Sequence, residues 1–447
     1  MRDFLPEDVR RREYVIGIIT RVYARYGFEP LETPAVENLD TLMGKYGDEG
    51  NQLIFKILKR GEALKDVALA DAADLALRYD LTVPLARVIA HHQSKLPKLF
   101  KRYQIQPVWR ADRPGRGRFR EFYQCDVDAL GSTSPVVEAE LCGIVCEVLA
   151  ELGFSDFYLR LNHRVLLTEV LNAAGVPEEL HGTALVALDK LDKIKIDGVS
   201  AEMGERGISP NAIDALMSVF EGNVAPGGVP GSPLASLQAV ADFVSGAEPN
   251  RPSVENLRTI IEYAQATPAK GRIVFAPSLA RGLSYYTGAI MEANVPDLAG
   301  SLGGGGRYDN LVGMFLGQSV PACGFSLGLE RILVVMGERN MFPPSLATTP
   351  ADVMMAVFDA KDQPHAIRVA QTLRASGLRV MVYPDADKIG KQIKYADTQR
   401  IPYVAILGGD EIANGTVTVK NLSAQTQTTY DQAAAGAAIL EGLKHRG

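Results

Sequence analysis

Hydrophobic and polar residues alternate along two neighbouring stretches of the chain, 99–110 and 119–130. This period of two predicts a pair of β-strands. The sequence between them, ADRPGRGR, is rich in proline, glycine and arginine, so the strands are expected to form a hairpin with a long basic tip. One face of the second strand is apolar and is predicted to lie in a core; it carries Phe119, Tyr123, Cys125, Val127 and Ala129.

The other face of this hairpin is polar. Its second strand contributes Arg118, Arg120, Phe122, Gln124, Asp126 and Asp128, and its first strand adds Arg102, Gln104, Gln106 and Arg110 at matching parity. A solvated sheet face is one explanation. A ligand site is the other, because arginines at the tip suit phosphate oxygens and carboxylates farther along suit an amine or an imidazole. Such a face would bind an amino acid joined to a nucleotide.

Helices and strands are predicted on either side of this hairpin. Residues 8–26 and 135–152 have the apolar spacing of helices, and 165–265 is mostly helical with a Gly/Pro-rich interruption at 225–233. Strand character returns at 272–292, where LARGLSYYTGAIMEA (279–293) places an arginine and two tyrosines among small and apolar residues. GFSLGLERI (324–332) reads as a strand running into a helix. An arginine at the start of that helix opposes the helix dipole unless it meets an anion such as phosphate.

The last hundred residues have a different pattern. FPPSLATTPADV (342–353) has the composition of a linker. Short apolar strands follow at 353–359, 379–385, 403–409 and 416–421, with helices predicted at 366–376 and 389–400 between them. This alternation predicts a small α/β domain with a mostly parallel sheet.

Length and composition restrict the class of protein. A chain of 447 residues exceeds one ordinary core, so roughly two to four structural units are expected. No apolar run is long enough to span a membrane, and the N-terminus lacks the apolar core of a signal peptide, so we expect a cytosolic protein. The four cysteines show no zinc-finger spacing. Cys142 and Cys146 lie one helical turn apart and could share a metal, but buried thiols are the simpler expectation.

Two further motifs are ambiguous by themselves. The run GGGG at 303–306 allows close approach of a ligand, but a tight turn or a bulge explains it equally well. It lacks the lysine of a P-loop, and no G-x-G-x-x-G opens a helix after a strand. Asp80 and Thr82 would share one face of an extended segment, although Asp-x-Thr is more often a turn or a helix cap.

Together these segments resemble the histidyl-tRNA synthetases, a family of class II aminoacyl-tRNA synthetases, over nearly the whole chain. FEPLETPAVE (28–37), residues 100–131 and GFSLGLERI (324–332) resemble the three class II motifs: a dimer-interface segment, an antiparallel hairpin, and a strand and helix with an arginine. LARGLSYYTG (279–288) and GGGGRYDNLVG (303–313) resemble the stretches that mark the histidine-specific members. LRYDLTVPLAR (77–87) and REFYQCDVD (120–128) resemble the wording of eukaryotic and archaeal members.

The resemblance implies an α/β (α+β) fold. A class II catalytic domain built on an antiparallel sheet would occupy 1–340, with an inserted helical module at about 165–265. A linker at 341–350 and a small anticodon-binding domain at 351–447 would follow. The family forms homodimers, uses ATP and Mg²⁺, and joins L-histidine to tRNA(His) in protein synthesis, with no membrane attachment.

The resemblance also assigns roles to individual residues. The substrate's α-amino group would be bound by Asp80, Leu81, Thr82 and Gln124, and its imidazole by Asp128, Tyr285 and Tyr286. Arg110 and Arg281 would be the catalytic pair on the histidine carboxylate and the ATP α-phosphate. ATP would also contact Asp112, Arg118, Arg331 and Gly303, Gly304, Gly305 and Gly306. No metal site made by protein residues alone is implied.

The C-terminal domain would read the anticodon. Lys388, Lys391, Lys394 and Arg400 lie on or beside the helix predicted at 389–400, with Tyr395 among them. Cations and a stacking ring suit bases in a single-stranded loop, and the resemblance assigns this role to Lys391, Lys394 and Tyr395. A solvated basic helix face is the alternative.

The chain departs from the family pattern at two places. Family members usually carry aspartate where this chain has Ser284, so a carboxylate beside Arg281 is missing. The chain also starts at MRDFLPE, without the small-residue lead-in that the family commonly has.

Two other functions stay open at this point. One is a synthetase-like regulatory subunit of ATP phosphoribosyltransferase, which binds histidine as a signal. Such paralogues usually lack the anticodon domain and the ATP-site arginines, whereas this chain has Arg110, Arg281 and Arg331. The other is a synthetase-like RNA-binding or regulatory module without activity.

Overall fold

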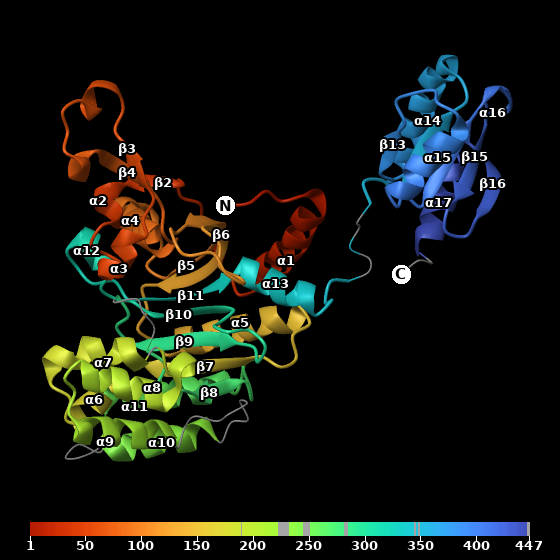
Figure 1. The fold of residues 1–447 in the computed structure, drawn as a ribbon. Helices are drawn as coiled ribbons and strands as arrows, with labels where there is room; N and C mark the ends of the chain where they lie inside the picture. Colours follow the sequence, from red (N-terminus) through yellow and green to blue (C-terminus); the bar gives the residue numbers. More distant parts are fainter. Residues whose placement is uncertain are drawn as a thin grey trace. The chain divides into compact units, whose positions relative to one another are not determined.

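The computed structural model describes residues 1–188, 190–221, 232–244, 251–280, 285–343, 346 and 349–444. These residues divide into two compact units. The larger contains Arg12–Met341 with the first three residues, and the smaller contains the chain from Phe342 onward with Phe4–Arg11. Each unit has a sheet of its own, shown in Figure 1.

An eight-stranded, mostly antiparallel sheet forms the centre of the larger unit. Its strand order is β1-β5-β6-β11-β10-β9-β7-β8, and only the outer pairs β1–β5 and β7–β8 are parallel. The strands, in that order, are Glu29–Pro30, Phe100–Trp109, Glu121–Leu130, Ala322–Gly328, Gly303–Arg307, Ala289–Asn294, Tyr158–His163 and Ile273–Phe275. The predicted hairpin is therefore confirmed as β5 and β6. Its register places Arg102 opposite Asp128, Gln104 opposite Asp126 and Gln106 opposite Gln124.

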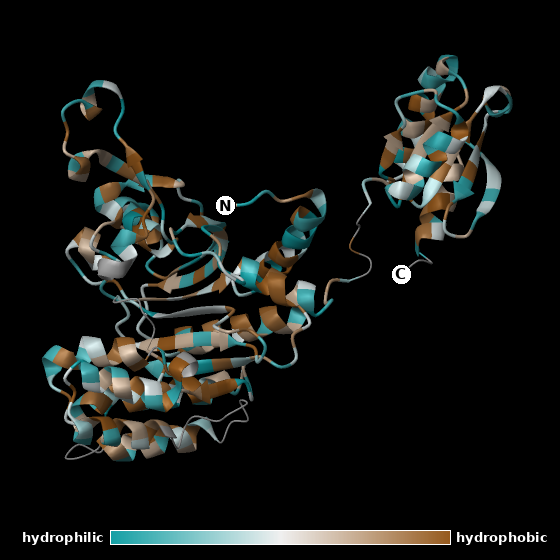
Figure 2. Ribbon diagram, in the orientation of Figure 1, coloured by the Kyte–Doolittle hydropathy of each residue, from teal (hydrophilic) through white to brown (hydrophobic). Residues whose placement is uncertain are grey.

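Three helices cover the central strands: α1 (Pro6–Arg25), α5 (Val136–Glu151) and α13 (Leu329–Glu338). α5 packs on β11 and α13 packs on β6. Each helix buries apolar side chains, for example Leu141, Ile144 and Val148 of α5. Apolar residues are brown in Figure 2. The side chain of Tyr23 in α1 is fully buried, and its hydroxyl donates to the Cys125 carbonyl at 3.0 Å.

A group of helices lies at the β7–β8 end of the sheet, drawn in yellow and green in Figure 1. They are α6 (Arg164–Ala173), α7 (His181–Leu188), α8 (Leu191–Glu205), α9 (Pro210–Glu221), α10 (Pro233–Val244) and α11 (Pro252–Ala264), with the 3-10 turn η4 (Glu178–Leu180). α6, α10 and α11 pack against β7 or β8. The inserted module therefore extends one edge of the sheet rather than covering its centre.

A second, three-stranded sheet of order β2-β4-β3 lies near the other end. Its strands are Val36–Asn38, Ala73–Leu77 and Lys56–Leu58, and the short helices beside them are α2 (Leu39–Leu42), α3 (Gly47–Gln52), η1 (Gly61–Leu64) and η2 (Leu69–Asp71). β4 leads into α4 (Thr82–His92) and η3 (Gln93–Lys95). Asp80 and Thr82 thus lie at a strand-to-helix turn, not in an extended segment.

Two sequence-based expectations differ from the structure. The single strand expected at 272–292 is two strands, β8 and β9, and Tyr285 and Tyr286 lie before β9 rather than in it. The glycine run is not a turn but the central strand β10. Backbone of β11 lies so close to β10 that a Cβ at Gly305 would stand 2.0 Å from the Gly324 carbonyl oxygen, which explains glycine in a strand.

The smaller unit contains a mixed five-stranded sheet of order β13-β12-β14-β15-β16. Its elements are β12 (Val353–Val357), η5 (Ala360–Asp362), α14 (Gln363–Ala375), β13 (Val380–Val382), α15 (Ile389–Thr398), β14 (Tyr403–Leu407), α16 (Gly409–Asn414), β15 (Thr416–Asn421), β16 (Thr426–Asp431) and α17 (Ala435–Lys444). β13, β12 and β14 form the expected parallel part. β15 and β16 are antiparallel, so the sheet is mixed rather than mostly parallel.

Two earlier questions about composition are answered in the described part of the chain. None of its helices has the length and apolar character that crossing a bilayer needs. All four cysteines are free and buried, and Cys142 contacts Met291 with its sulfur 3.5 Å from the thioether sulfur. They pack as small apolar side chains.

Candidate active site

A cavity of about 420 Å³ opens over the centre of the large sheet. Its floor comes from β6, β10 and β11, and its rim comes from the start of α4, the β5–β6 loop and the residues before β9. The lining residues include Asp80, Thr82, Arg110, Asp112, Arg118, Gln124, Asp126, Asp128, Tyr285, Tyr286, Gly303, Gly304, Gly305 and Arg331. Part of the polar face predicted for the hairpin therefore lines a cavity, through Arg110, Arg118, Phe122, Gln124, Asp126 and Asp128.

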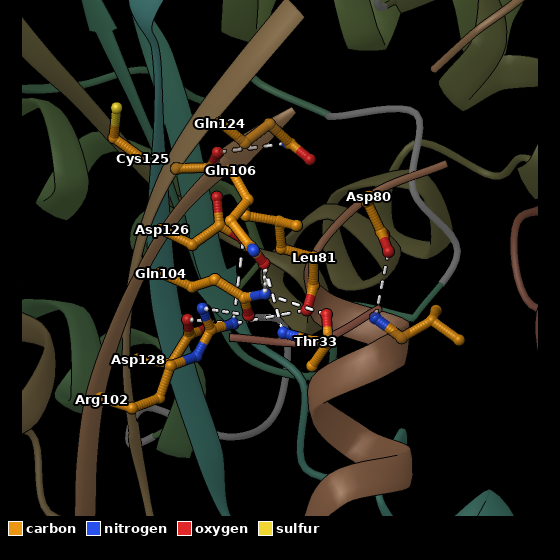
Figure 3. A network of polar contacts seen from close by, with 12 residues as sticks. Thr33, Asp80, Leu81, Arg102, Gln104, Gln106, Gln124, Cys125, Asp126 and Asp128 are labelled. Carbon is orange, nitrogen blue, oxygen red and sulfur yellow. Dashed lines mark hydrogen bonds and ion pairs between the residues drawn. The ribbon is translucent and has the colours of Figure 1, made fainter. Parts of the chain in front are cut away.

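One end of the cavity is rich in carboxylates. Asp126 and Asp128 lie on one face of β6, and both are buried. Arg102 on β5 is fully buried, and its Nη2 lies 2.8 Å from Oδ2 of Asp128 and 3.9 Å from Oδ2 of Asp126. Tyr308, which follows β10, donates its hydroxyl to Oδ1 of Asp128. Figure 3 shows Arg102 with Asp126 and Asp128.

Burial controls the protonation of these acids. It raises the pKa of both Asp126 and Asp128, and Arg102 opposes that rise. Asp126 Oδ1 and Gln124 Oε1 accept no hydrogen bond from any described residue. Buried acceptors of this kind are normally satisfied, so this end of the cavity is prepared for a ligand with several N–H donors.

Asp80 adds a further carboxylate from the other wall. Its Oδ1 accepts from the hydroxyl of Tyr46 at 2.9 Å and from the backbone N–H of Val83 at 3.0 Å. Burial raises its pKa, while these two hydrogen bonds lower it. Its Oδ2 has no hydrogen-bond partner among the described residues. The turn before α4 thus fixes one oxygen and leaves the other for a ligand.

The opposite end of the cavity is cationic. Arg110, just after β5, donates from Nε to the Tyr79 carbonyl at 3.0 Å. Its guanidinium lies 4.2 Å from the ring centre of Tyr79 and 5.2 Å from that of Phe122. A hydrogen bond and two rings therefore hold this cation in place.

Arg118 and Arg331 add two more cations to this end. Arg331, in the first turn of α13, donates to the Ser301 carbonyl at 2.5 Å. Gly117 of the β5–β6 loop has φ +68°, and a Cβ there would stand 3.1 Å from Cγ of Arg331. The loop that carries Arg118 thus packs directly on the helix that carries Arg331. A triple arginine wall of this kind suits a polyphosphate.

Three tyrosines border the carboxylate end. The rings of Tyr285 and Tyr286 are 4.9 Å apart, and the ring of Tyr285 is 6.0 Å from that of Tyr308. All three line the cavity. The pair Tyr285–Tyr286 therefore reaches the cavity from a turn and not, as expected, from a strand.

Not every predicted site residue lines the cavity. Leu81 is fully buried beneath it, and its carbonyl lies 3.5 Å from Nη2 of Arg102. Gly306 packs against the backbone of Ala289 instead of lining the cavity. Arg281 and Ser284 lie outside the described residues.

Some lining residues were not assigned a role from the sequence. They are Tyr46, Tyr79, Phe122, Asp126, Ser326, Tyr308 and Glu330, among others. Asp126 and Phe122 lie on the polar face that strand alternation predicts, and Glu330 lies at the start of the helix predicted from GFSLGLERI. The sequence therefore contained a signal for these three residues. Tyr46 and Tyr308 had none, because only tertiary contact brings them to Asp80 and Asp128.

Glu330, at the start of α13, is the most exceptional of these residues. Only 2% of its surface is exposed. Its Oε2 accepts from the backbone N–H of Tyr123 at 2.9 Å, and its Oε1 has no hydrogen-bond partner among the described residues. Burial raises its pKa from 4.5 to about 7.

Replacing Glu330 by glutamine should stabilise the protein at pH 8 by about 3 kcal/mol. The folded state holds the Glu330 proton up to about pH 7, whereas the unfolded chain releases it near 4.5, so stability contributed by this group is lost as pH rises through that window. Urea unfolding at pH 4.5 and pH 8 measures the difference. The stability gain of Glu330→Gln over wild type should vanish at pH 4.5.

The exposed Glu338 of the same helix provides the matched control. Its ion pair with Arg116 at 2.5 Å is solvent-exposed and screened by water, so Glu338→Gln should not reproduce the pH-dependent gain in stability expected of Glu330→Gln. A Glu330→Gln protein with the same stability gain at pH 4.5 and pH 8 would mean that charge burial is not the cause.

The described residues contain no group of three or more His, Cys, Asp or Glu side chains arranged to hold a metal ion. Asp80, Asp128 and Glu330 are instead each paired with a tyrosine, an arginine or a backbone N–H.

The smaller unit has a basic helix face of its own. Lys391 is exposed and pairs with Asp387 at 2.7 Å. Tyr395, 39% exposed, packs its ring 5.3 Å from that of Tyr383, and Lys394 next to it is exposed. The helix α15 therefore presents two cations and an accessible ring to solvent, the arrangement expected from the sequence.

Comparison with known proteins gives a consistent family for both units. Residues 1–332 match the family model for histidyl-tRNA synthetase, and residues 352–441 match that for an anticodon binding domain. The histidine–tRNA ligase of Christiangramia forsetii is 41% identical, over 96% of each chain.

Solved structures have the same fold as this chain. The crystal structure of histidyl-tRNA synthetase from Nostoc sp. PCC 7120 is 31% identical and covers 98% of this chain and 97% of its own, with a TM-score of 0.80. A Bacillus halodurans protein described as an ATP phosphoribosyltransferase regulatory subunit/histidyl-tRNA synthetase has a TM-score of 0.71 over 92% of this chain and 97% of its own. At 19% identity, that likeness shows a shared fold only.

Proposed function

The chain belongs to the histidyl-tRNA synthetase family and is a ligase that attaches histidine to tRNA(His), and we propose that the cavity over its large sheet is where this reaction takes place. The observation that supports this location is the polarity of the cavity. Carboxylates at one end and arginines at the other match the two substrates, an amino acid with a cationic amino group and a nucleotide with a polyphosphate.

Histidine occupies the carboxylate end in this proposal. Its ammonium group donates to Oδ2 of Asp80 and to Oε1 of Gln124, two acceptors without a partner among the described residues, beside Thr82. Leu81 contributes only as the residue between Asp80 and Thr82. The imidazole then lies near Asp128, with Tyr285 and Tyr286 as its walls.

ATP occupies the cationic end. Arg110 contacts the histidine carboxylate and the α-phosphate, and Arg118 and Arg331 contact the outer phosphates. Gly303, Gly304 and Gly305, with Asp112 at the rim, form the adenosine side, and Gly306 continues the same strand outside the cavity. Arg281 is proposed on the resemblance alone as the second catalytic arginine, because it lies outside the described residues.

The chemistry is mainly placement and charge neutralisation. A carboxylate oxygen of histidine attacks the α-phosphorus of ATP in line, and the bond to the bridging oxygen breaks, so pyrophosphate leaves with its electron pair. Arg110 neutralises charge that develops on the α-phosphate. The terminal hydroxyl of the tRNA then attacks the adenylate carbonyl and AMP leaves.

Magnesium fits this cavity only as an ion carried by ATP. Mg²⁺ usually takes one or two carboxylates together with substrate phosphates. Oε1 of Glu330, which precedes Arg331, is a carboxylate oxygen that has no hydrogen-bond partner in the described part of the chain. When bound, the ion would neutralise the outer phosphates.

The remaining assignments concern partners. We propose that Lys391, Lys394 and Tyr395 on α15 contact the anticodon, where the ring stacks on a base and the lysines meet phosphates. We propose a homodimer that forms through the segment at 28–37, and a cytosolic location. Domains at 1–340 and 351–447, with a linker at 341–350, are proposed as the functional division.

ATP–pyrophosphate exchange with each of the twenty amino acids tests the function. Exchange that depends on histidine, with transfer of labelled histidine to tRNA(His), is expected. Histidine binding without exchange would instead support the regulatory-subunit alternative. The three cavity arginines, Arg110, Arg118 and Arg331, and the anticodon-type unit favour the enzyme.

A further inference from the structure

Arg102 has no role in the function proposed above, and yet it is the most buried cation beside the cavity. Its exposed surface is 0%, and the cavity's Asp126 and Asp128 lie on either side of its Nη2. The same Nη2 is 3.5 Å from the Leu81 carbonyl, and Nη1 is 3.3 Å from Oε1 of Gln104. Arg102 therefore contacts residues of two cavity walls, β6 and the turn before α4 (Figure 3).

A fold alone gains little from such a cation. Taking a guanidinium out of water costs several kcal/mol, and apolar residues of similar volume are often as stable as a buried ion pair. Nε of Arg102 also has no hydrogen-bond partner among the described residues, so this guanidinium is incompletely satisfied. A cost of this kind, paid beside a ligand cavity, points to function.

The geometry points to Arg102 as a positioning residue for histidine: we propose that it orients the Asp128 carboxylate for the imidazole and ties that carboxylate to the turn that holds Asp80. This inference rests on the proposed function and extends it. Arg102 lies outside the cavity lining and acts only through the residues that it contacts.

The first part of the argument concerns Asp128. Two donors fix this carboxylate, because Arg102 lies at Oδ2 and the Tyr308 hydroxyl donates to Oδ1. The ion pair does not form an aligned hydrogen bond at Oδ2, so that oxygen retains a lone pair for a ligand N–H. Asp128 is thus fixed by two side chains, and its Oδ2 can still accept a hydrogen bond from a ligand.

The second part concerns the turn before α4. Leu81 separates Asp80 from Thr82, and its carbonyl points to the same guanidinium that holds Asp128. Gln104, opposite Asp126 in the hairpin, extends the network to Thr33 at 2.9 Å and to Gln106 at 2.6 Å. Arg102 therefore fixes the spacing between the amino-group side and the imidazole side of one substrate, as a supporting residue should.

Charge supports the same role. Burial alone would favour neutral acids at Asp126 and Asp128, and the guanidinium counteracts it. The other titratable groups that face this pair come from α1, the turn before α4, β10 and β11; they are Tyr23, Asp80, Tyr308 and Cys323. None of these four groups carries a positive charge, so Arg102 is the cation that faces the two carboxylates.

Arg102→Gln and Arg102→Lys test the proposal in histidine-dependent exchange and in equilibrium binding of histidine without ATP. Arg102→Gln should raise KM and Kd for histidine about 30-fold and leave KM for ATP within about threefold. Arg102→Lys keeps a cation but loses the fork, so its histidine KM should lie between wild type and Arg102→Gln. The histidine KM of Arg102→Gln should also fall as pH rises, because burial raises the pKa of Asp128 and its carboxylate then forms at higher pH.

Arg307→Gln is the matched control. Arg307 is also a buried arginine, with Nε paired to Glu138 at 2.6 Å, but it does not line the cavity. Its replacement should lower stability and leave both KM values within about threefold. If Arg102→Gln does not fold, Arg102→Lys decides alone, with a rise of about fivefold expected in the histidine KM only.

Two outcomes would overturn the inference. One is a parallel rise of the histidine and ATP KM values in the Arg102 variants, which is the pattern of general misfolding. The other is an unchanged histidine KM. The wild-type enzyme separates this test from the function itself, because absence of histidine-dependent exchange in wild type contradicts the function, whereas these outcomes contradict only the role of Arg102.

Discussion

Replacing Arg110 by alanine is expected to lower kcat/KM for histidine-dependent ATP–pyrophosphate exchange by about 10³-fold. Loss of one preorganised donor at a developing oxyanion typically costs on the order of 3–4 kcal/mol. Arg110 is preorganised, because the Tyr79 carbonyl and the rings of Tyr79 and Phe122 hold its guanidinium before any substrate arrives. The loss should appear mainly in kcat, since the charge that Arg110 neutralises develops in the transition state.

Arg113 provides the control for this experiment. It lies in the same loop, is exposed, and does not line the cavity, so Arg113→Ala should change exchange by less than about threefold. Arg110→Lys should fall between the two, because lysine keeps the charge without the planar fork. An Arg110→Ala enzyme with more than about a tenth of wild-type kcat would remove Arg110 from the catalytic pair.

Gly305→Ala is expected to cost at least about 4 kcal/mol of stability, with little folded protein recovered. The new Cβ would lie 2.0 Å from the Gly324 carbonyl oxygen and 2.6 Å from the Phe325 Cα. Both atoms are backbone of the neighbouring central strand β11, so no side-chain rotation relieves the clash. Circular dichroism and urea unfolding of the purified protein measure the effect.

Gly337→Ala is the comparison for that experiment. This glycine lies in α13, and a Cβ there meets nothing within 4 Å among the described residues. Alanine should therefore be neutral or stabilise the protein by about 0.5 kcal/mol. If Gly305→Ala folded with wild-type stability, the close approach of β10 and β11 would not be the reason for glycine in that strand.

The parts of the site that were predictable from the sequence depend on local periodicity. Alternation along 119–130 placed Gln124, Asp126 and Asp128 on one face, and the register of β5 and β6 confirms that they share it with Gln104 and Arg102. That pattern needs no knowledge of the rest of the fold, because side chains alternate in any extended strand.

The parts that were not predictable depend on tertiary contact. Tyr308 reaches Asp128 across 180 residues of chain, and Tyr46 reaches Asp80 across 34 residues that include β3 and β4. The glycines at 303–306 suggested a turn, because the close backbone of β11 that selects them is invisible in the sequence. Tyr285 and Tyr286 were assigned to a strand because the apolar residues of β9 follow them directly.

The order of strands in the large sheet has a consequence for synthesis of the protein on the ribosome. β6 and its neighbour β11 are adjacent in the sheet, with Asp128 beside Gly324, although nearly two hundred residues separate them. At about 5–20 residues per second, β6 waits roughly 10–40 s for this partner. During that interval β6 lacks β11, one of its two neighbouring strands. The charged residues of the β5–β6 hairpin are then not fully buried, and one edge of β6 stays unpaired. We therefore expect the yield of active enzyme to depend on translation speed and chaperone access between residues 130 and 322, as well as on the final stability.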